Sequence, residues 1–138
     1  FFFAFAMDQK IQEEFAALPQ ECKDFLTGDE HKKNCKEIYD KAGGPLNRAT
    51  VAKIRESFTA FVMPKVSEEV RTKLSGGKLT DEQKDAVWAK MSGGADAIEL
   101  PAFVKLTSGI YTHALAQGVV LDNLRKYSDE WRASFSLQ

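Results

Sequence analysis

The chain has 138 residues, of which 43% are hydrophobic and 28% are charged, and its formal net charge is -1. A chain of this length suits one globular domain, and its 19 basic and 20 acidic residues are spread along the sequence without a basic block large enough to neutralise a run of phosphates. The composition therefore argues against nucleic acid as a partner.

The first residues form an apolar segment, with four phenylalanines within Phe1–Phe5. The segment has no basic flank and is too short for a signal peptide or a membrane span. We interpret residues 1–7 as an apolar N-terminal extension and residues 8–138 as a single helical domain. The alternative is that Phe1–Phe5 contact a membrane surface or a partner, since exposed apolar patches of this kind usually bind something.

Apolar residues recur at helical spacing through most of the chain, and no run alternates convincingly with the period of a strand. Thr80 and Gln83 form a capping-box pattern, which is typical of a helix start. We therefore predict an all-α fold. The expected helices cover residues 8–17, a short segment from Pro19, residues 29 to the glycine break at Gly43, residues 49–63, a short segment from Ser67 to the glycines at 76–77, and residues 80–91, 99–115 and 119–135.

A helix–loop–helix pattern occurs twice, and the second copy lies 52 residues after the first. Repetition at a fixed spacing indicates a paired module in which neither unit buries its apolar face alone. Four positions are identical between the copies, in the pairs Asp29 and Asp81, Glu30 and Glu82, Lys32 and Lys84, and Lys53 and Lys105. Apolar positions also coincide, in the pairs Cys35 and Val87, Tyr39 and Met91, Leu46 and Ile98, Val51 and Phe103, Ile54 and Leu106, and Phe58 and Ile110.

The two copies, about residues 29–63 and 80–115, resemble EF-hands. Each has a helix, a short glycine-containing loop with one aliphatic residue near its end, Leu46 or Ile98, and a second helix whose first inward residue follows five positions later. Residues 79–83, Leu-Thr-Asp-Glu-Gln, are similar to the opening of calmodulin-like proteins. The resemblance implies that Leu46 and Ile98 meet in a short two-stranded contact between the loops, with additional helices at both ends of the chain.

The resemblance also implies a groove between the paired helices, in which an amphipathic helix of a partner protein binds. The residues expected to form this groove, or the shared core beneath it, are Val51, Ile54, Phe58, Val87, Trp88, Met91, Phe103, Leu106 and Ile110. The segment 119–135 carries an aromatic stripe at helical spacing, so it is a candidate to fill the groove within the same chain.

Both loops differ from those of calcium-binding EF-hands. A calcium loop needs oxygen ligands at its first, third, fifth and twelfth positions, and the last is a bidentate glutamate. If the register is shifted by one residue, so that the loops begin at Asp40 and Ser92, each loop supplies one carboxylate at these positions, Asp40 or Asp96. In the register that puts Leu46 and Ile98 at the eighth position, no carboxylate is present. The four ligand positions then hold Tyr39, Lys41, Gly43 and Thr50 in the first loop and Met91, Gly93, Ala95 and Ala102 in the second. We therefore predict that neither loop binds calcium, and we expect no metal or other cofactor.

Other chemical sites have less support. Residues 75–80 contain glycines and a lysine but lack the strand and the spacing of a phosphate-binding loop. Cys22, His31 and Cys35 lack the spacing of a zinc site, and the two cysteines are more typical of reduced, buried thiols, which indicates a cytoplasmic protein. His31 and His113 lie on separate helices, and no pattern pairs either with a nucleophile. We predict no enzymatic activity.

The function predicted from the sequence is that of a non-catalytic, calcium-independent adaptor. It would be similar to a calmodulin or myosin light-chain lobe and would bind an amphipathic helix of another protein. The first alternative is a small helical subunit of a large assembly, in which the paired units are only a scaffold. The second alternative is a carrier of a lipid or another hydrophobic ligand, with phenylalanine-rich and tryptophan-bearing helices around a cavity.

Overall fold

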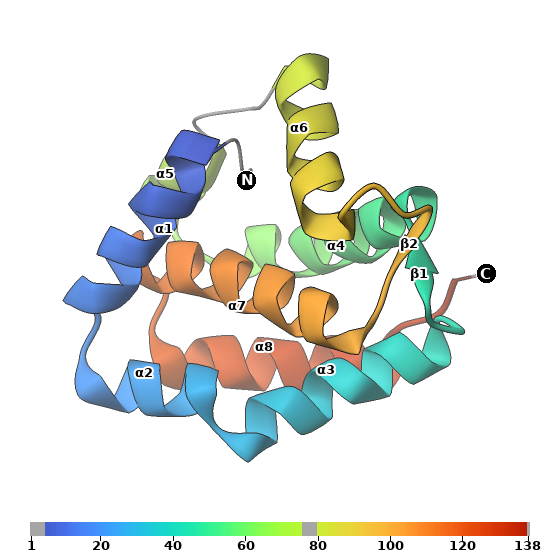
Figure 1. Cartoon of the computed structure of the whole chain (residues 1–138). Helices are drawn as coiled ribbons and strands as arrows, with labels where there is room; N and C mark the ends of the chain where they lie inside the picture. Colours follow the sequence, from blue (N-terminus) through green and yellow to red (C-terminus); the bar gives the residue numbers. More distant parts are fainter. Residues whose placement is uncertain (1–4, 76–79, 138) are drawn as a thin grey trace.

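The computed structural model describes residues 5–75 and 80–137 of the chain. These residues are mostly helical (Figure 1), which confirms the predicted all-α fold. None of their helices has the length and the apolar character that a crossing of a lipid bilayer requires. The elements in chain order are α1 (Phe5–Ala17), α2 (Gln20–Thr27), α3 (Asp29–Lys41), β1 (Leu46–Asn47), α4 (Arg48–Val62), the 3₁₀ turn η1 (Met63–Lys65), α5 (Glu68–Ser75), α6 (Asp81–Ser92), β2 (Ala97–Ile98), α7 (Leu100–Ala116) and α8 (Leu121–Ser134).

Local sequence signals explain where several helices begin and end. The predicted capping box starts α6, because the Thr80 hydroxyl accepts a hydrogen bond from the Gln83 backbone N–H and the Gln83 side chain accepts one from the Thr80 backbone. The side chain of Asn47 caps α4 by accepting from the backbone N–H three residues later, at 2.9 Å. Pro64 lies in η1 and prevents α4 from continuing.

The N-terminal segment differs from the prediction. Helix α1 begins at Phe5 rather than at Asp8, because the intervening residues are helix formers without glycine or proline. Residues 1–4 and 76–79 lie outside the described residues. The first three phenylalanines of the proposed membrane or partner contact of Phe1–Phe5 and the predicted glycine stop at 76–77 therefore fall outside the described part of the chain.

The two helix–loop–helix units meet through their loops. Strands β1 and β2 pair in antiparallel register, with Leu46 opposite Ile98 and Asn47 opposite Ala97. Leu46 is 1% exposed and Ile98 is 2% exposed, so the two residues expected to meet across the loops do so inside the core. In each unit one helix precedes the loop, α3 or α6, and one follows it, α4 or α7.

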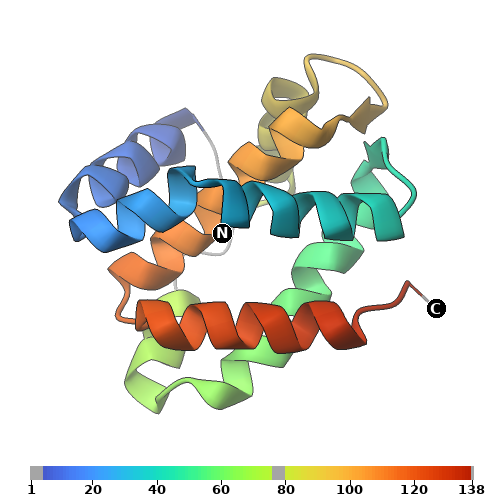
Figure 2. The same ribbon diagram turned by 90° about the horizontal axis from the view of Figure 1, so that it is seen from below.

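The centre of the hydrophobic core lies between α3, α4, α7 and α8. Figure 2 shows α3 and α8 on the same face of the molecule, with α4 and α7 behind them. Helix α3 packs along α7, and α8 packs against both α4 and α7. From α8, Leu124 is fully buried, and the ring of Trp131 lies against that of Phe58 with centroids 5.1 Å apart. Helix α8 thus fills, within the same chain, part of the surface predicted to bind a partner.

The two units are not packed symmetrically. Because α3 packs along α7, the repeat leads to the expectation that α6 packs along α4 in the same way. Helix α8 occupies that place on α4 instead, and α6 stands at the opposite end of the molecule from α3 and α8 (Figure 1). Within the described chain, α6 contains no buried residue and reaches the core only at its edge. This displacement of α6 leaves an open space beside α7.

Candidate functional site

The displaced helix α6 forms one wall of an open groove. The groove has a volume of about 470 Å³, with α7 at its base and α1 as the opposite wall, an arrangement that can be followed in Figure 1. The lining residues are Ile11, Gln12 and Phe15 from α1, Val87, Lys90 and Met91 from α6, and Ala102, Lys105, Leu106, Ser108, Gly109 and Thr112 from α7.

The base of the groove consists of small side chains, and its hydroxyl groups already have hydrogen-bond partners within the protein. Ser108, Gly109 and Thr112 are small, so the surface of α7 is low at this point. The Thr112 hydroxyl donates to the backbone oxygen of Ser108 at 2.7 Å, and the Ser108 hydroxyl lies 2.9 Å from Nε2 of His31. Because these polar atoms have partners within the protein, an apolar group can cover them without leaving them unpaired.

The α1 wall is fixed to α7 by a cluster of three polar side chains. Nδ1 of His113 lies 3.2 Å from Glu14 Oε1, and Gln117 Nε2 donates to Glu14 Oε2 at 3.1 Å. The side chains of His113 and Glu14 are mostly buried, where a carboxylate without such partners would be costly. The cluster holds the helix that presents Ile11 and Phe15 to the groove.

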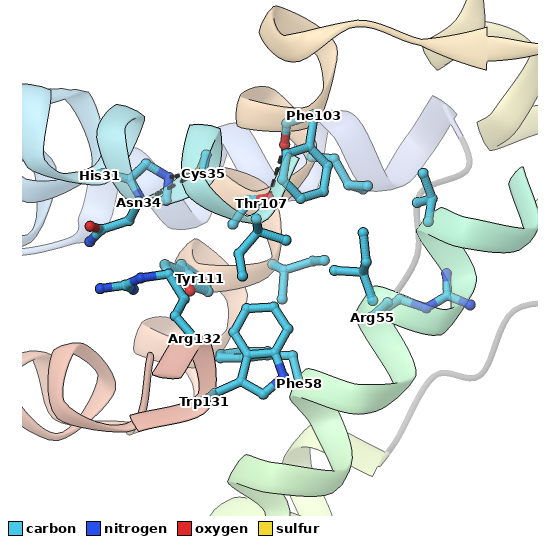
Figure 3. A pocket seen from close by; sticks show the side chains of 15 residues that line it. His31, Asn34, Cys35, Arg55, Phe58, Phe103, Thr107, Tyr111, Trp131 and Arg132 are labelled. Carbon is cyan, nitrogen blue, oxygen red and sulfur yellow. Dashed lines mark hydrogen bonds between the residues drawn. The ribbon is translucent and has the colours of Figure 1, made fainter. Parts of the chain in front are cut away.

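A second and much smaller cavity, of about 40 Å³, lies at the centre of the paired units. Figure 3 shows Trp131 and Arg132 reaching it from α8, with Phe58 of α4 beside Trp131 and Phe103 of α7 on the far side. Equivalent positions of the two second helices line it, in the pairs Val51 and Phe103, Ile54 and Leu106, Arg55 and Thr107, and Phe58 and Ile110. This cavity therefore marks the centre of the twofold arrangement, and α8 closes it.

The structure divides the nine residues predicted for the groove or shared core into two groups. Five are buried around the small cavity, namely Val51, Ile54, Phe58, Phe103 and Ile110. The others are less buried and lie nearer the open groove, with Leu106 lining both spaces, Val87 and Met91 lining the groove, and Trp88 at the edge of the core. The α6 residues thus lie at the margin of the shared core, because α8 covers the part of α4 that a symmetrically packed α6 would cover.

A buried polar network joins α3 to α7 beneath the groove. His31 is fully buried, its Nε2 lies 2.9 Å from the Ser108 hydroxyl, and the Cys35 sulfur lies 3.7 Å from Nε2 and 4.0 Å from Nδ1. Burial lowers the pKa of His31 to about 4, the Arg132 guanidinium adds to this effect, and the Glu30 carboxylate opposes it. Burial also raises the pKa of Cys35 to about 11. Both groups are therefore neutral at neutral pH.

Ser108 and His31 carry a hydroxyl and an imidazole, the two groups of a nucleophile and its base. Their proximity could not be predicted from the sequence. In such sites a third group, usually a carboxylate, orients the imidazole. Here the Cys35 thiol, which is protonated, lies closer to Nε2 than to Nδ1, so it does not play the orienting role of a carboxylate. These contacts support a structural bridge between the two helices rather than an activated nucleophile.

The shifted pKa of His31 predicts a loss of stability in mild acid. The unfolded chain binds a proton on this residue near pH 6.5 and the folded chain only near pH 4, so the stabilisation is complete above 6.5 and falls as the pH decreases through this window. Between pH 7 and pH 5 the free energy of unfolding is expected to fall by about 2 kcal/mol. Urea unfolding at several pH values measures this change. A His31→Gln variant should lose most of the pH dependence, and an unchanged dependence in that variant would contradict the assignment.

Sequence reasoning does not find the α1 wall or the two lysines of the groove. Which residues of α1 and α7 face one another depends on how these helices cross, and helical periodicity carries no information on that crossing. The row of small residues at Ser108, Gly109 and Thr112 is the one local signal of a hollow on α7.

Cys22 and Cys35 are free and buried, as predicted. The described residues contain no group of three or more His, Cys, Asp or Glu side chains placed to hold a metal ion. Comparisons with protein-family models, with curated proteins and with solved structures gave no match to this chain.

Proposed function

We propose that the protein is a calcium-independent adaptor that binds an amphipathic helix of a partner protein in the groove between α1, α6 and α7. The observation that carries this proposal is the position of α6, which projects from the paired units and presents Val87 and Met91 to an open groove. Amphipathic helices bind in such grooves through apolar anchors at positions i, i+3, i+4 and i+7. The antiparallel contact of Leu46 with Ile98 supports a relationship to EF-hand lobes.

Helix α8 illustrates how this fold holds a helix against α3 and α4. Trp131 is its aromatic anchor, and the indole N–H donates to the Ser57 hydroxyl of α4 at 3.0 Å. Arg125 makes two hydrogen bonds to the carboxylate of Glu30 on α3, at 2.7 and 3.1 Å. An apolar anchor with charged contacts at the margin is the usual composition of a protein interface. The groove beside α6 offers the same combination of an apolar base and charged margins.

The first loop supports calcium independence through the side chains at its ligand positions. Tyr39 stands where an EF-hand has its first carboxylate, and a Cβ atom added to Gly44 would lie only 2.3 Å from the Tyr39 ring. The ring therefore lies directly against the loop backbone, and its centroid is 6.3 Å from that of Phe103. An aromatic ring in this position packs the loop onto the core and offers no charged oxygen to a cation.

Site-directed photo-crosslinking tests the proposal. A photoreactive amino acid in place of Val87 is expected to crosslink a partner in cell extract, and mass spectrometry should locate the crosslink in a helical segment with apolar residues at i, i+3, i+4 and i+7. Ala102→Trp adds a large ring to the groove, away from the small cavity, and is expected to abolish the crosslink. The result should be the same with calcium and with a chelator.

The matched control places the same photoreactive group at Glu130, which is exposed on α8. Crosslinks that form equally from both positions, or that persist in Ala102→Trp, would contradict binding in the groove. Crosslinks that require calcium would contradict the assignment of the loops.

The volume of the groove favours one rival function, that of a carrier for a hydrophobic ligand. Sites for small molecules usually measure about 300–1,000 Å³ and have mostly apolar linings, and the groove agrees with both. Native mass spectrometry of the purified protein distinguishes the two functions. A small apolar molecule that is retained by the wild-type protein and lost in Ala102→Trp would favour the carrier.

A further inference from the structure

We infer that α6 is a hinged wall of the groove, which pivots at Gly93 and Gly94 and closes toward α1 over a bound apolar helix. This inference rests on the proposed function and adds the conformational change that accompanies binding. Its basis is the way in which α6 is attached to the rest of the molecule. Within the described chain α6 buries none of its residues, and it stands at the opposite end of the molecule from α3 and α8 (Figure 1).

The C-terminal end of α6 is its attached end. The main contacts of the helix are with β2, which follows it in the chain. Trp88 and Met91, which lie in the second half of the helix, pack at the edge of the core. By contrast, residues 81–86 are all exposed. Segments with few buried apolar contacts are the ones that move at low cost in free energy, so a helix held at one end can rotate as a unit.

Two glycines directly after α6 provide the pivot. The φ angle is 63° at Gly93 and 89° at Gly94, a region that glycine enters without steric cost. A Cβ atom added to either residue would meet nothing within 4 Å, so neighbouring side chains do not wedge this turn. Hinges consist of a few such residues, whose backbone angles absorb the movement. The helix itself stays intact during the rotation, because the capping box at Thr80 closes its other end.

An exposed ion pair holds α6 in its open position. The Asp85 carboxylate lies 2.7 Å from the guanidinium of Arg48 at the start of α4, and the two side chains are 65% and 48% exposed. Asp85 precedes Val87 by two residues, or about 200° of helical rotation, so Arg48 contacts the side of α6 opposite the groove. Movement of α6 toward α1 therefore separates this pair. Lys90 of α6 also has a partner within the chain.

A bound helix supplies the free energy that closes the groove. Val87 and Met91 line the groove and are only half-buried in the free protein, so part of their apolar surface is in contact with water. A partner helix covers this surface more completely when α6 lies closer to it, and the burial of apolar surface is favourable. Binding therefore shifts the population of α6 toward the closed position, and the ion pair with Arg48 opposes the shift.

Distances between two spin labels, measured by pulsed electron–electron double resonance, follow the position of α6. The labels are attached to Lys84→Cys on α6 and Ala16→Cys on α1, both at exposed positions, and the buried native cysteines react poorly with the label. In the free protein, Arg48→Gln is expected to shift the distances to shorter values. A synthetic peptide of about 16 residues, or between four and five helical turns, with a leucine and phenylalanine stripe should shorten them further. The control labels, on α1 and at exposed Lys53 of α4, should keep their distance.

The affinity of the same peptide tests the role of the ion pair. Arg48→Gln and Asp85→Asn should each increase the affinity about threefold at low salt, because each removes an interaction made only in the open position. The two variants change the net charge in opposite directions, so the general field of the protein cannot explain an increase in both. The matched control is Arg125→Gln, which breaks an ion pair with Glu30 that is also 2.7 Å long and similarly exposed. This control should bind like the wild-type protein in fluorescence anisotropy.

The possible outcomes separate this inference from the function on which it rests. If the peptide does not bind the wild-type protein, the proposed helix-binding function is overturned, and the hinge is then decided by the free protein. Unchanged label distances in free Arg48→Gln would overturn the hinge. If the peptide binds and the distance between α6 and α1 stays the same, helix binding stands and closure is overturned. If Arg125→Gln increases the affinity as much as Arg48→Gln, the assignment to the ion pair of α6 is overturned.

Discussion

Trp131→Ala is expected to lower the free energy of unfolding by about 3–5 kcal/mol, the usual cost of truncating a buried tryptophan. The indole is only 5% exposed, contacts the rings of Phe58 and Phe135 with centroids 5.1 Å away, and donates to the Ser57 hydroxyl. Such a loss is a large part of the total stability of a small domain. Urea unfolding followed by circular dichroism measures it.

Two further variants serve as comparisons for Trp131→Ala. Trp131→Phe keeps an aromatic ring and removes the hydrogen bond to Ser57, so it should cost clearly less than the alanine variant. Val120→Ala changes an exposed residue just before α8 and should alter stability by less than about 0.5 kcal/mol. If Trp131→Ala were as mild as Val120→Ala, α8 would be a surface appendage and not part of the core.

Leu46→Ala and Ile98→Ala are each expected to cost about 2–5 kcal/mol, because both side chains are almost fully buried. These residues face one another across the paired strands, so the double variant should be less destabilised than the sum of the single variants by about 1 kcal/mol. The coupling energy from urea unfolding of the four proteins measures the contact between the two units directly.

Leu26→Ala provides the control for the double-mutant cycle of Leu46→Ala and Ile98→Ala. Leu26 is buried in α2, which precedes α3, whereas Leu46 follows α3, and the length of that helix, about 20 Å, separates the two residues. The effects of Leu26→Ala and Leu46→Ala should therefore add. If Leu46→Ala and Ile98→Ala were equally additive, the loop contact would not join the two units energetically.

The parts of the fold that depend on local pattern could be predicted. The helices follow from apolar spacing, and the capping box from Thr80 to Gln83 has a recognisable signature four residues long. The contact of Leu46 with Ile98 follows from the repeat, because equivalent residues of two equivalent loops can pair across a twofold axis. In each case the necessary information lies within one helix or is carried by the offset of the repeat.

The position of α6 could not be predicted in the same way. Helices α6 and α8 both have apolar residues at helical spacing, and both have a stereochemically reasonable place on α4. Which of them occupies it depends on the balance of many contacts, including the anchor Trp131 and the bidentate pair of Arg125 with Glu30. The open groove results from that balance. Of its lining residues, the sequence therefore predicted only Val87, Met91 and Leu106.

During synthesis, protein domains tend to fold in order from the N-terminus as the chain leaves the ribosome. Trp131 and Phe135 complete a core whose first member is Leu18, so α4 keeps a bare apolar side until nearly all of the described chain has emerged. Helix α8 is the last helix of the described chain. Closure of that side of α4 therefore waits for nearly the whole described chain, whatever the other helices have already formed.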